Sequence, residues 1–298
     1  MHKNQFRLHH ISAMAEIKIA GVMRAGAYSP NHIGNDAAIF NAVMEQLRKR
    51  GCEVNVYSEE QLAAGAVKEN IILNMCREPR SIDILQKKED QGALVINSGF
   101  GLENCIRERS ARILLGNDIP YPESLIVNTD EGVKDTLKKK GISQCWIKRG
   151  DSHSRHKEDV SYVRHPQEAQ EILQEYFLRG IKRAVINRHL EGELIKFYGI
   201  TGTPFFFWFF HFAKDPSSAQ KESIEALRID DSAIRELCNS AAEAAGIEIY
   251  GGDIILDNDG KMWIIDLNDW PTFAPCRQEA SVEIAKYVLG RIKSHNSR

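Results

Sequence analysis

The stretch YGGDIILDNDGKMWIIDLNDWPTF, residues 250–273, constrains the fold most, because it places acidic residues inside two strongly apolar segments. Apolar segments on either side of a DNDG turn predict a β-hairpin. A two-residue turn would place Asp253 diagonally across from Asp266, on the face that also carries Asn268. A three-residue loop with a bulge at Gly260 would instead shift the pairing by one residue. The hairpin with a two-residue turn therefore predicts that three oxygen-bearing side chains converge.

Convergent carboxylate and amide oxygens suit a hard cation such as Mg²⁺, which completes its octahedral shell with water and phosphate oxygens. Asp253, Asp266 and Asn268 are therefore the candidate metal ligands. The alternative is that the acids face solvent on a half-exposed hairpin. Asn268 favours the metal site, because it is a neutral oxygen donor just beyond an acid and is followed by an acid and a Trp-Pro pair.

The composition indicates a protein of two or three lobes that acts on small molecules. Its 298 residues, 43% of them hydrophobic, can bury a substantial core. A formal net charge of -2 provides no overall field that would attract nucleic acid or an anionic membrane. The longest apolar run, PFFFWFF at residues 204–210, is too short to span a bilayer. We expect a buried strand there, and an aromatic wall of the substrate site is the alternative.

The cysteines and the N-terminus favour a cytoplasmic location. The six cysteines form no CxxC pair and show no zinc-binding spacing, which suits a reducing compartment. Residues 1–16 lack an apolar run of signal-peptide length and are expected to be a disordered extension, with Met14 as an alternative start.

Apolar strands alternate with helical patterns over residues 17–117, as expected for an α/β lobe with a parallel sheet. The proline-marked segment NDIPYPESLIV then leads into a region where hairpins and helices predict α+β structure with an antiparallel sheet. In open α/β sheets, ligands bind beyond the carboxyl ends of the strands. Arg24 and His32 follow the first expected strand and are therefore candidate substrate-binding residues. Arg109 and Arg277 are weaker candidates for binding an anionic substrate group.

Two segments of the hairpin, GGDIIL and WIIDLNDWP, resemble the metal-binding end of the ATP-grasp superfamily. In that superfamily, an acid on one strand and an acid-x-Asn on the next hold two Mg²⁺ ions against ATP. Three further matches occur in order along the chain. CWIKRGD is similar to the strand whose lysine contacts ATP phosphate, AVINRHLEG to the hinge strand beside adenine, and ELIKFYGI to the strand that follows it.

The resemblance implies an ATP-grasp fold of mixed α/β and α+β class, in which two α+β lobes clamp ATP beside an N-terminal Rossmann-like lobe. It divides the chain into a pre-ATP-grasp lobe at residues 17–117, a small lobe at 118–186 and a C-terminal lobe with the metal site at 187–298. The implied cofactors are ATP and two Mg²⁺ ions, for which Mn²⁺ could substitute. The implied partner is a small-molecule acceptor.

The resemblance also assigns roles to individual residues. The implied nucleotide-binding residues are Lys148, His153, Arg188, Leu190 and Lys196. The implied catalytic residues are Lys148, Lys196 and Asp266. A solvated loop is the alternative for His153, and an exposed edge strand is the alternative for Lys148.

Two departures from the common ATP-grasp pattern bear on the reaction. The segment GDSHSRHKED replaces a glycine-rich phosphate loop, and Asp266 stands where most ligases have Glu. Both are similar to the inositol 1,3,4-trisphosphate 5/6-kinase branch, and other details resemble the ribosomal-protein glutamate ligase branch. The resemblance thus favours a kinase that transfers the γ-phosphoryl group of MgATP to a small polar or anionic acceptor. The alternatives are a carboxylate-amine ligase that acts through an acyl phosphate and a non-catalytic ATP-binding module.

Overall fold

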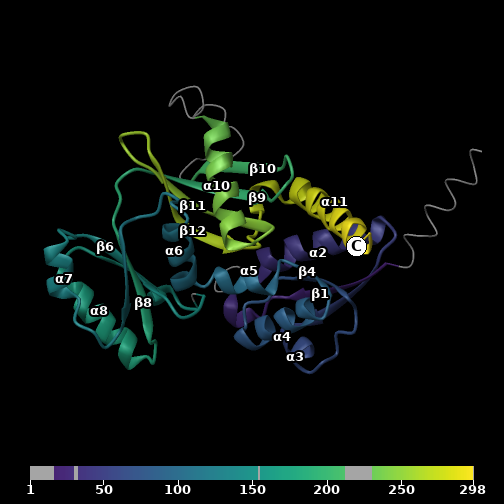
Figure 1. Ribbon diagram of the computed structural model, residues 1–298, viewed down its shortest axis with the longest axis horizontal. Coiled ribbons are helices and arrows are strands. Elements are labelled where there is room, and N and C mark those ends of the chain that lie inside the picture. The colour runs from purple at the N-terminus through teal and green to yellow at the C-terminus, as the bar shows by residue number, and fades with distance from the viewer. Residues whose placement is uncertain (1–16, 30–32, 154, 212–229, 298) are drawn as a thin grey trace, which may run out of the picture.

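The described part of the chain forms three four-stranded sheets (Figure 1). The computed structural model describes four segments, residues 17–29, 33–153, 155–211 and 230–297. The extension expected at residues 1–16 and the candidate His32 lie outside these segments. Across the described segments, no helix is both long and apolar enough to cross a membrane.

The first sheet is fully parallel, as predicted, with the strand order β2-β1-β3-β4. Its strands are β1 (Lys18–Met23), β2 (Glu53–Ser58), β3 (Ile71–Asn74) and β4 (Leu94–Ile96). Its helices are α2 (Ile33–Lys49), α3 (Glu59–Ala63), α4 (Pro79–Asp90) and α5 (Gly99–Asn104). Ile19 packs with α2 on one face of β1, whereas Ala20 packs with α3 and α4 on the other. Burial on both faces explains the nearly continuous apolar strands of this lobe.

The second sheet is antiparallel, with the strand order β5-β8-β6-β7. Its strands are β5 (Ser124–Asn128), β6 (Cys145–Arg149), β7 (Val160–Val163) and β8 (Arg183–Arg188). The helices beside it are α6 (Arg107–Gly116), which precedes it in the chain, α7 (Lys134–Lys139) and α8 (Pro166–Leu178). Leu137 of α7 and Leu173 of α8 are fully buried in one cluster with Ile147 of β6, so these two helices cover one face of the sheet.

The third sheet is also antiparallel, with the strand order β10-β9-β11-β12. Its strands are β9 (Glu193–Ile200), β10 (Phe206–Phe210), β11 (Ile249–Leu256) and β12 (Met262–Asp269), and its long helices are α10 (Asp231–Ala245) and α11 (Arg277–Asn296). The described segments also contain three short 3₁₀ helices, η1 (Gly26–Tyr28), η2 (Lys157–Asp159) and η3 (Ala274–Cys276). Trp208 in β10 is fully buried, which confirms the buried strand expected in the aromatic run.

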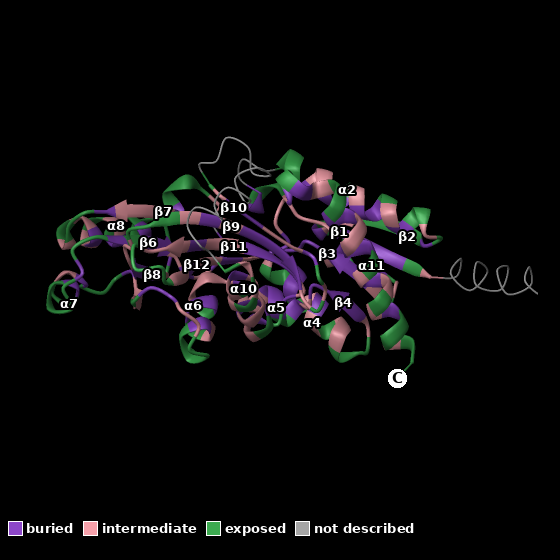
Figure 2. Cartoon of the chain, turned by 90° about the horizontal axis from the view of Figure 1, so that it is seen from above, coloured by how far each residue is buried: buried purple, intermediate pink, exposed green. Residues whose placement is uncertain are grey.

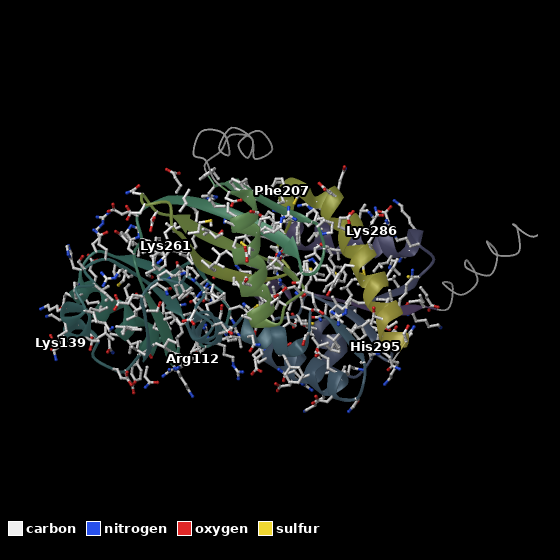
Figure 3. All side chains as sticks on the ribbon, turned by 45° about the horizontal axis from the view of Figure 1, so that its top comes forward. Arg112, Lys139, Phe207, Lys261, Lys286 and His295 are labelled. Carbon is white, nitrogen blue, oxygen red and sulfur yellow. The ribbon has the colours of Figure 1, made fainter. Side chains whose placement is uncertain are left out.

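Charged side chains project from the outer surface, as Lys139, Lys261 and Lys286 do (Figure 3), whereas purple, buried residues run along the strands through the middle of the molecule (Figure 2). The six cysteines are all buried and free of disulfides. They therefore act as packing residues, as their scattered positions in the sequence predict.

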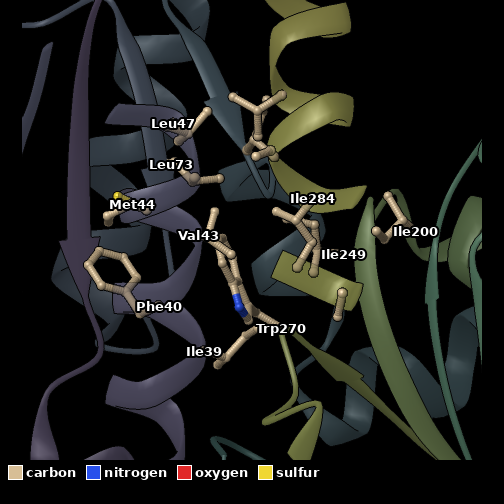
Figure 4. Close-up of a cluster of buried hydrophobic side chains, with 14 of the residues drawn as sticks. Ile39, Phe40, Val43, Met44, Leu47, Leu73, Ile200, Ile249, Trp270 and Ile284 are labelled. Carbon is tan, nitrogen blue, oxygen red and sulfur yellow. The ribbon is translucent and has the colours of Figure 1, made fainter. Parts of the chain in front are cut away.

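One hydrophobic core joins the first and third sheets. It contains Phe40 of α2, Ile249 of β11 and Ile284 of α11, all with at most 1% exposure. Trp270, directly after β12, lies fully buried among them with its ring centroid 6.3 Å from that of Phe40 (Figure 4). Because an aromatic side chain buries a large apolar area, this core fixes the end of β12 against the N-terminal lobe.

Candidate active site

The two hairpin carboxylates lie directly opposite each other, because Asp253 on β11 pairs with Asp266 on β12. Of the two turns that the sequence left open, the structure has the three-residue loop with Gly260. The Asp257 amide donates to the Lys261 carbonyl at 3.0 Å, which closes a three-residue loop, and Gly260 in that loop has a φ of 79°. Such a loop favours glycine at the left-handed position. By itself, this loop would move the two acids out of register.

A β-bulge in β12 restores their alignment. Ile254 pairs with Ile264 while Asp253 pairs with Asp266, so Ile265 has no partner on β11. The extra residue shifts the pairing by one position. The two acids therefore face each other across neighbouring strands, closer than the predicted diagonal arrangement.

Lys196 and Asn268 complete a polar cluster around these acids. Lys196 lies beside Asp253 on β9, and its Nζ is 2.8 Å from Asp253 Oδ1. Asn268 lies two residues beyond Asp266, and its Nδ2 donates to Asp266 Oδ2 at 2.9 Å. Three adjacent strands thus bring together the three candidate metal ligands and Lys196.

The two carboxylates have opposite pKa shifts. Burial raises the pKa of Asp253, and the adjacent Lys196 only partly opposes this effect. Burial acts in the same direction on Asp266, but Arg107 and Lys148 outweigh it and lower the pKa of Asp266 to about 2. The Arg107 guanidinium lies 3.5 Å from Asp266 Oδ1. Asp266 is therefore ionised at neutral pH.

Lys148, on β6 of the second sheet, reaches across to this cluster. Its Nζ donates to the carbonyl oxygen of Ile265 at 2.8 Å, and the residue is only 7% exposed. Burial lowers the pKa of Lys148 to about 8, although Asp266 opposes the shift. The alternative of a solvent-facing edge-strand lysine is wrong, because β6 lies between β8 and β7 and the side chain is buried.

A cavity of about 270 Å³ lies between the second and third sheets. Its apolar wall includes Leu190, Leu194 and Ile255, and Trp146 from β6 lines it as well. The Trp146 indole donates to His189 Nδ1 at 3.2 Å. Such a slot between aromatic and aliphatic side chains suits a flat heterocycle.

Of the remaining residues with implied nucleotide roles, Arg188 also lines this apolar cavity, while its Nη2 lies 2.7 Å from Glu123 Oε2. His153 lies elsewhere. It is 7% exposed and lines a second, polar cavity, so the alternative of a solvated loop is wrong for this residue. Burial and Arg77 lower the pKa of His153 to about 3, so the ring is neutral. Its Nε2 lies 4.0 Å from Asp269 Oδ1 and has no hydrogen-bond partner in the described part of the chain.

The polar cavity has a volume of about 440 Å³ and extends to the N-terminal lobe. It shares Arg107, Asp253 and Asp266 with the apolar cavity, so the two cavities meet at the facing carboxylates. Arg24 and Arg77 line its far side. The arrangement places an apolar slot and a charged second compartment on either side of one acidic pair.

The candidate substrate arginines differ in their placement. Arg24 lines the polar cavity, but its three nitrogens donate to protein oxygens, including those of Asp36 and Asp269. Arg109 pairs with Glu103 at 2.6 Å, is half-exposed and is not among the residues lining either cavity. Arg277 donates to Asn35 and is likewise outside both linings. The sequence-based roles of these arginines therefore stay predictions.

Sequence reasoning missed Arg77 and Arg107, which line the polar cavity. Arg107 and Arg109 are two residues apart on α6, so their side chains point to nearly opposite sides of the helix. Only the packing of α6 decides which of them faces the site. Arg77 follows the carboxyl end of β3, and the strand-end rule used for Arg24 could have found it.

The donor set fits a divalent cation. Two facing carboxylates already attract the cations Lys196 and Arg107, and an amide lies beside them. Within residues 17–297 as described, no group of three or more His, Cys, Asp or Glu side chains could hold a metal ion unaided. A site with two protein carboxylates is characteristic of Mg²⁺ that shares its shell with substrate phosphates and water.

No known protein family and no curated protein sequence matches the chain. Solved structures do match it over nearly their whole length. D-alanyl-alanine synthetase A from Vibrio cholerae is 10% identical with a TM-score of 0.68, and the match covers 95% of this chain and 99% of that one. D-alanine–D-alanine ligase from Bacillus anthracis complexed with ATP is 15% identical with a TM-score of 0.68, covering 94% and 99%. A RimK domain ATP-grasp protein from Sphaerobacter thermophilus is 15% identical with a TM-score of 0.66, covering 91% and 99%.

At these identities the likeness concerns the fold. The chain has the ATP-grasp fold that the ordered motifs of its sequence imply, with a parallel N-terminal sheet and two antiparallel sheets.

Proposed function

We propose that this chain is an ATP-dependent carboxylate-amine ligase. The observation that carries the proposal is the meeting of an apolar and a polar cavity at Asp253 and Asp266. The apolar cavity suits a purine ring, and the arginine-lined cavity suits a charged second substrate. The similar structures named as a D-alanine–D-alanine ligase and a D-alanyl-alanine synthetase support this alternative over the kinase that the sequence favoured.

The residues around the two cavities divide the work of binding ATP. Leu190, Leu194 and Trp146 would hold the adenine, and Lys148 would contact the phosphates at the inner end of the slot. Lys196 would contact the γ-phosphate, because it lies beside Asp253 where the cavities meet. A positive charge placed in a water-excluded site stabilises the charge that develops on transferring phosphoryl oxygens.

Asp253, Asp266 and Asn268 would hold two Mg²⁺ ions together with the ATP phosphates. Bound Mg²⁺ neutralises phosphate charge and polarises the phosphoryl oxygens. Asp266, whose pKa is lowered to about 2, stays ionised for this role across the physiological range. The three sheets would then correspond to the lobes inferred at residues 17–117, 118–186 and 187–298.

The chemistry proceeds in two displacements. A carboxylate oxygen of the first substrate attacks the γ-phosphorus, forming an acyl phosphate as the bond to ADP breaks. The nitrogen of the second substrate then attacks the acyl carbon, loses a proton and expels phosphate, which leaves an amide. The polar cavity would hold both reacting groups, and Arg107 would stabilise the phosphate oxygens at the junction of the cavities.

Product analysis tests this proposal. We would incubate the purified protein with MgATP and pairs drawn from amino acids, dipeptides, simple carboxylic acids and amines, and measure ADP, phosphate and new products by mass spectrometry. A ligase releases ADP and phosphate in equal amounts with an amide. ADP without free phosphate, accompanied by a phosphorylated acceptor, would identify the kinase instead. MgATP binding without turnover on any pair would favour the non-catalytic module.

A further inference from the structure

We infer that Arg77 recognises a free carboxylate on the amine-bearing substrate, so that this substrate belongs to the class of amino acids or carboxylated amines. The inference rests on the proposed ligase function for the second substrate being an amine. Arg77 lines the polar cavity on its N-terminal-lobe side, away from the apolar slot. A group bound there lies apart from the reacting phosphate.

One side of the Arg77 guanidinium is held rigidly by Asp269. Its Nε lies 3.0 Å from Asp269 Oδ1, and its Nη2 lies 3.0 Å from the same oxygen. Asp269 is the last residue of β12 and is completely buried, directly after Asn268. Side-chain entropy that is already lost in the unbound protein need not be lost on binding. Asp269 is therefore a positioning residue that orients Arg77 relative to the hairpin carboxylates.

The other side of Arg77 remains available. Its Nη1 has no hydrogen-bond partner among the described residues, whereas Nε and Nη2 both contact Asp269. The side chain retains 14% exposure within the cavity lining. Arginine N–H groups in a fixed planar array match the geometry of a carboxylate. The two donors of Nη1 can thus receive a substrate oxygen without breaking the contact with Asp269.

Arg24, the neighbouring arginine, has a different role. Its Nε donates to the Met75 carbonyl at 3.2 Å, its Nη1 to Asp36 at 2.9 Å and its Nη2 to Asp269 at 3.0 Å. It is only 5% exposed. Arg24 thus has a structural role, because it bridges the buried Asp36 and Asp269. Arg77 is the arginine that can face a ligand.

Charge balance selects a carboxylate over a phosphate at this position. Arg24 and Arg77 pair with Asp36 and Asp269, and the buried Glu59 accepts from the backbone amide of Arg77, so buried acids already surround the two arginines. A single negative charge can be met by the free donors of Arg77, but a dianion would bring a second charge next to these buried acids. The site therefore favours a monoanionic group held by directed hydrogen bonds.

The experiment compares acids with their uncharged analogues. We would measure by calorimetry the binding of a panel of amino acids and dipeptides, each paired with its C-terminal amide, to the protein with Mg²⁺ and a non-hydrolysable ATP analogue. The wild-type protein should bind the best free acid about 10- to 100-fold more tightly than its amide. Phosphorylated amines should not compete with that acid.

Three variants connect this preference to Arg77. Arg77→Met should reduce the acid-to-amide ratio to about one while the affinity for the ATP analogue changes less than about twofold, and Arg77→Lys should keep part of the preference. Arg112→Met is the matched control, because Arg112 is an exposed arginine on α6 that pairs with Glu108 (Figure 3). Thermal melts would confirm that each variant is folded, and Arg77→Lys keeps the test informative if Arg77→Met is not.

Either of two results would overturn the inference: no preference for acids in the wild-type protein across the whole panel, or an unchanged preference in Arg77→Met. The proposed ligase reaction is tested separately, by analysis of its products. A carboxylate preference that depends on Arg77 without any amide product would keep the recognition role and refute the ligase. Amide formation with an unchanged preference in Arg77→Met would support the ligase and refute the recognition role of Arg77.

Discussion

Lys148 donates a hydrogen bond of 2.8 Å to the carbonyl oxygen of Ile265, the residue that the bulge in β12 leaves without a partner on β11. The same irregularity that aligns Asp253 with Asp266 therefore also provides an acceptor for a buried amine from another sheet. Bulges often re-aim side chains beside functional sites. Here the bulge brings two acids and a lysine together.

Lys148 should make nucleotide binding depend on pH. Its pKa is lowered to about 8 by burial, so the amine loses its proton as the pH rises through 8. ATP phosphates favour the charged amine and must raise this pKa, so binding near pH 8 should take up a fraction of a proton, and affinity should fall at higher pH. Calorimetry in two buffers of different ionisation enthalpy would measure the uptake.

Lys148→Met should abolish that proton uptake and slow turnover on the order of 10²-fold. The control is Lys139→Met, an exposed lysine on α7 (Figure 3). Equal proton uptake in the wild-type and Lys148→Met proteins would exclude Lys148 as its source.

Asp266→Asn should remove turnover while leaving the fold intact. The change keeps the shape of the side chain but removes a charge that would hold Mg²⁺, and we expect ADP release to fall by at least about 10²-fold. Asp259→Asn, in the exposed turn of the same hairpin, provides the control. Stabilisation by MgATP in a thermal melt and the rate of ADP release are the two measurements. If both were unchanged in Asp266→Asn, the metal assignment would be wrong.

The sequence predicted the fold and the residues of the acidic hairpin, but not the hairpin's register. The fold and the hairpin residues could be predicted because their motifs are short stretches that can be recognised directly in the sequence. The bulge at Ile265 depends instead on contacts from outside the hairpin, since Ile264 N donates to the Pro120 carbonyl at 2.9 Å and Lys148 donates to Ile265. Such long-range partners of β12 are not visible in the local pattern of a strand.

The substrate-binding residues of the polar cavity were also only partly predictable from the sequence. The strand-end rule directed attention to the loop after β1, and Arg24 lines the polar cavity, while its role as a substrate-binding residue stays a prediction. Residue type could not reveal that the three nitrogens of Arg24 are bound by Asp36, Asp269 and the Met75 carbonyl, whereas Nη1 of Arg77 has no partner among the described residues. The distinction depends on which carboxylates the fold buries behind each arginine.

Trp146 should contribute to binding of the adenine ring but not of the phosphates. It lines the apolar cavity, and its ring centroid is 5.0 Å from that of Tyr162, which holds it in place. Trp146→Ala should weaken ATP binding about tenfold, the effect of losing one base-stacking partner. The affinity for inorganic tripolyphosphate should not change. Phe177→Ala, an exposed aromatic on α8, is the control. An equal loss of affinity for ATP and tripolyphosphate would show that Trp146 acts on the whole site and not on the base.

Arg24 should matter more for stability than for substrate binding, contrary to the role its position in the sequence predicted. Arg24→Met would leave Asp36 and Asp269 buried with one fewer cation, which should lower the free energy of unfolding by about 3 kcal/mol. Urea unfolding would measure this change, with Lys49→Met as the control, since Lys49 pairs with Glu45 at the surface.

The loss of stability at acidic pH should also change in Arg24→Met. The pKa of Asp269 is lowered to about 2, because Arg77 and Arg24 outweigh the effect of its burial. Its contribution to stability is therefore complete above its unfolded pKa of about 4 and is lost as the pH falls toward 2. Removing Arg24 should raise that folded pKa and reduce the contribution, so the loss of stability on acidification from pH 4 to pH 2 should be smaller in Arg24→Met. Acceptor affinity, measured well below the melting temperature, should stay within a few-fold of wild type. An unchanged unfolding free energy combined with weakened acceptor binding would contradict the structural role and return Arg24 to the substrate site.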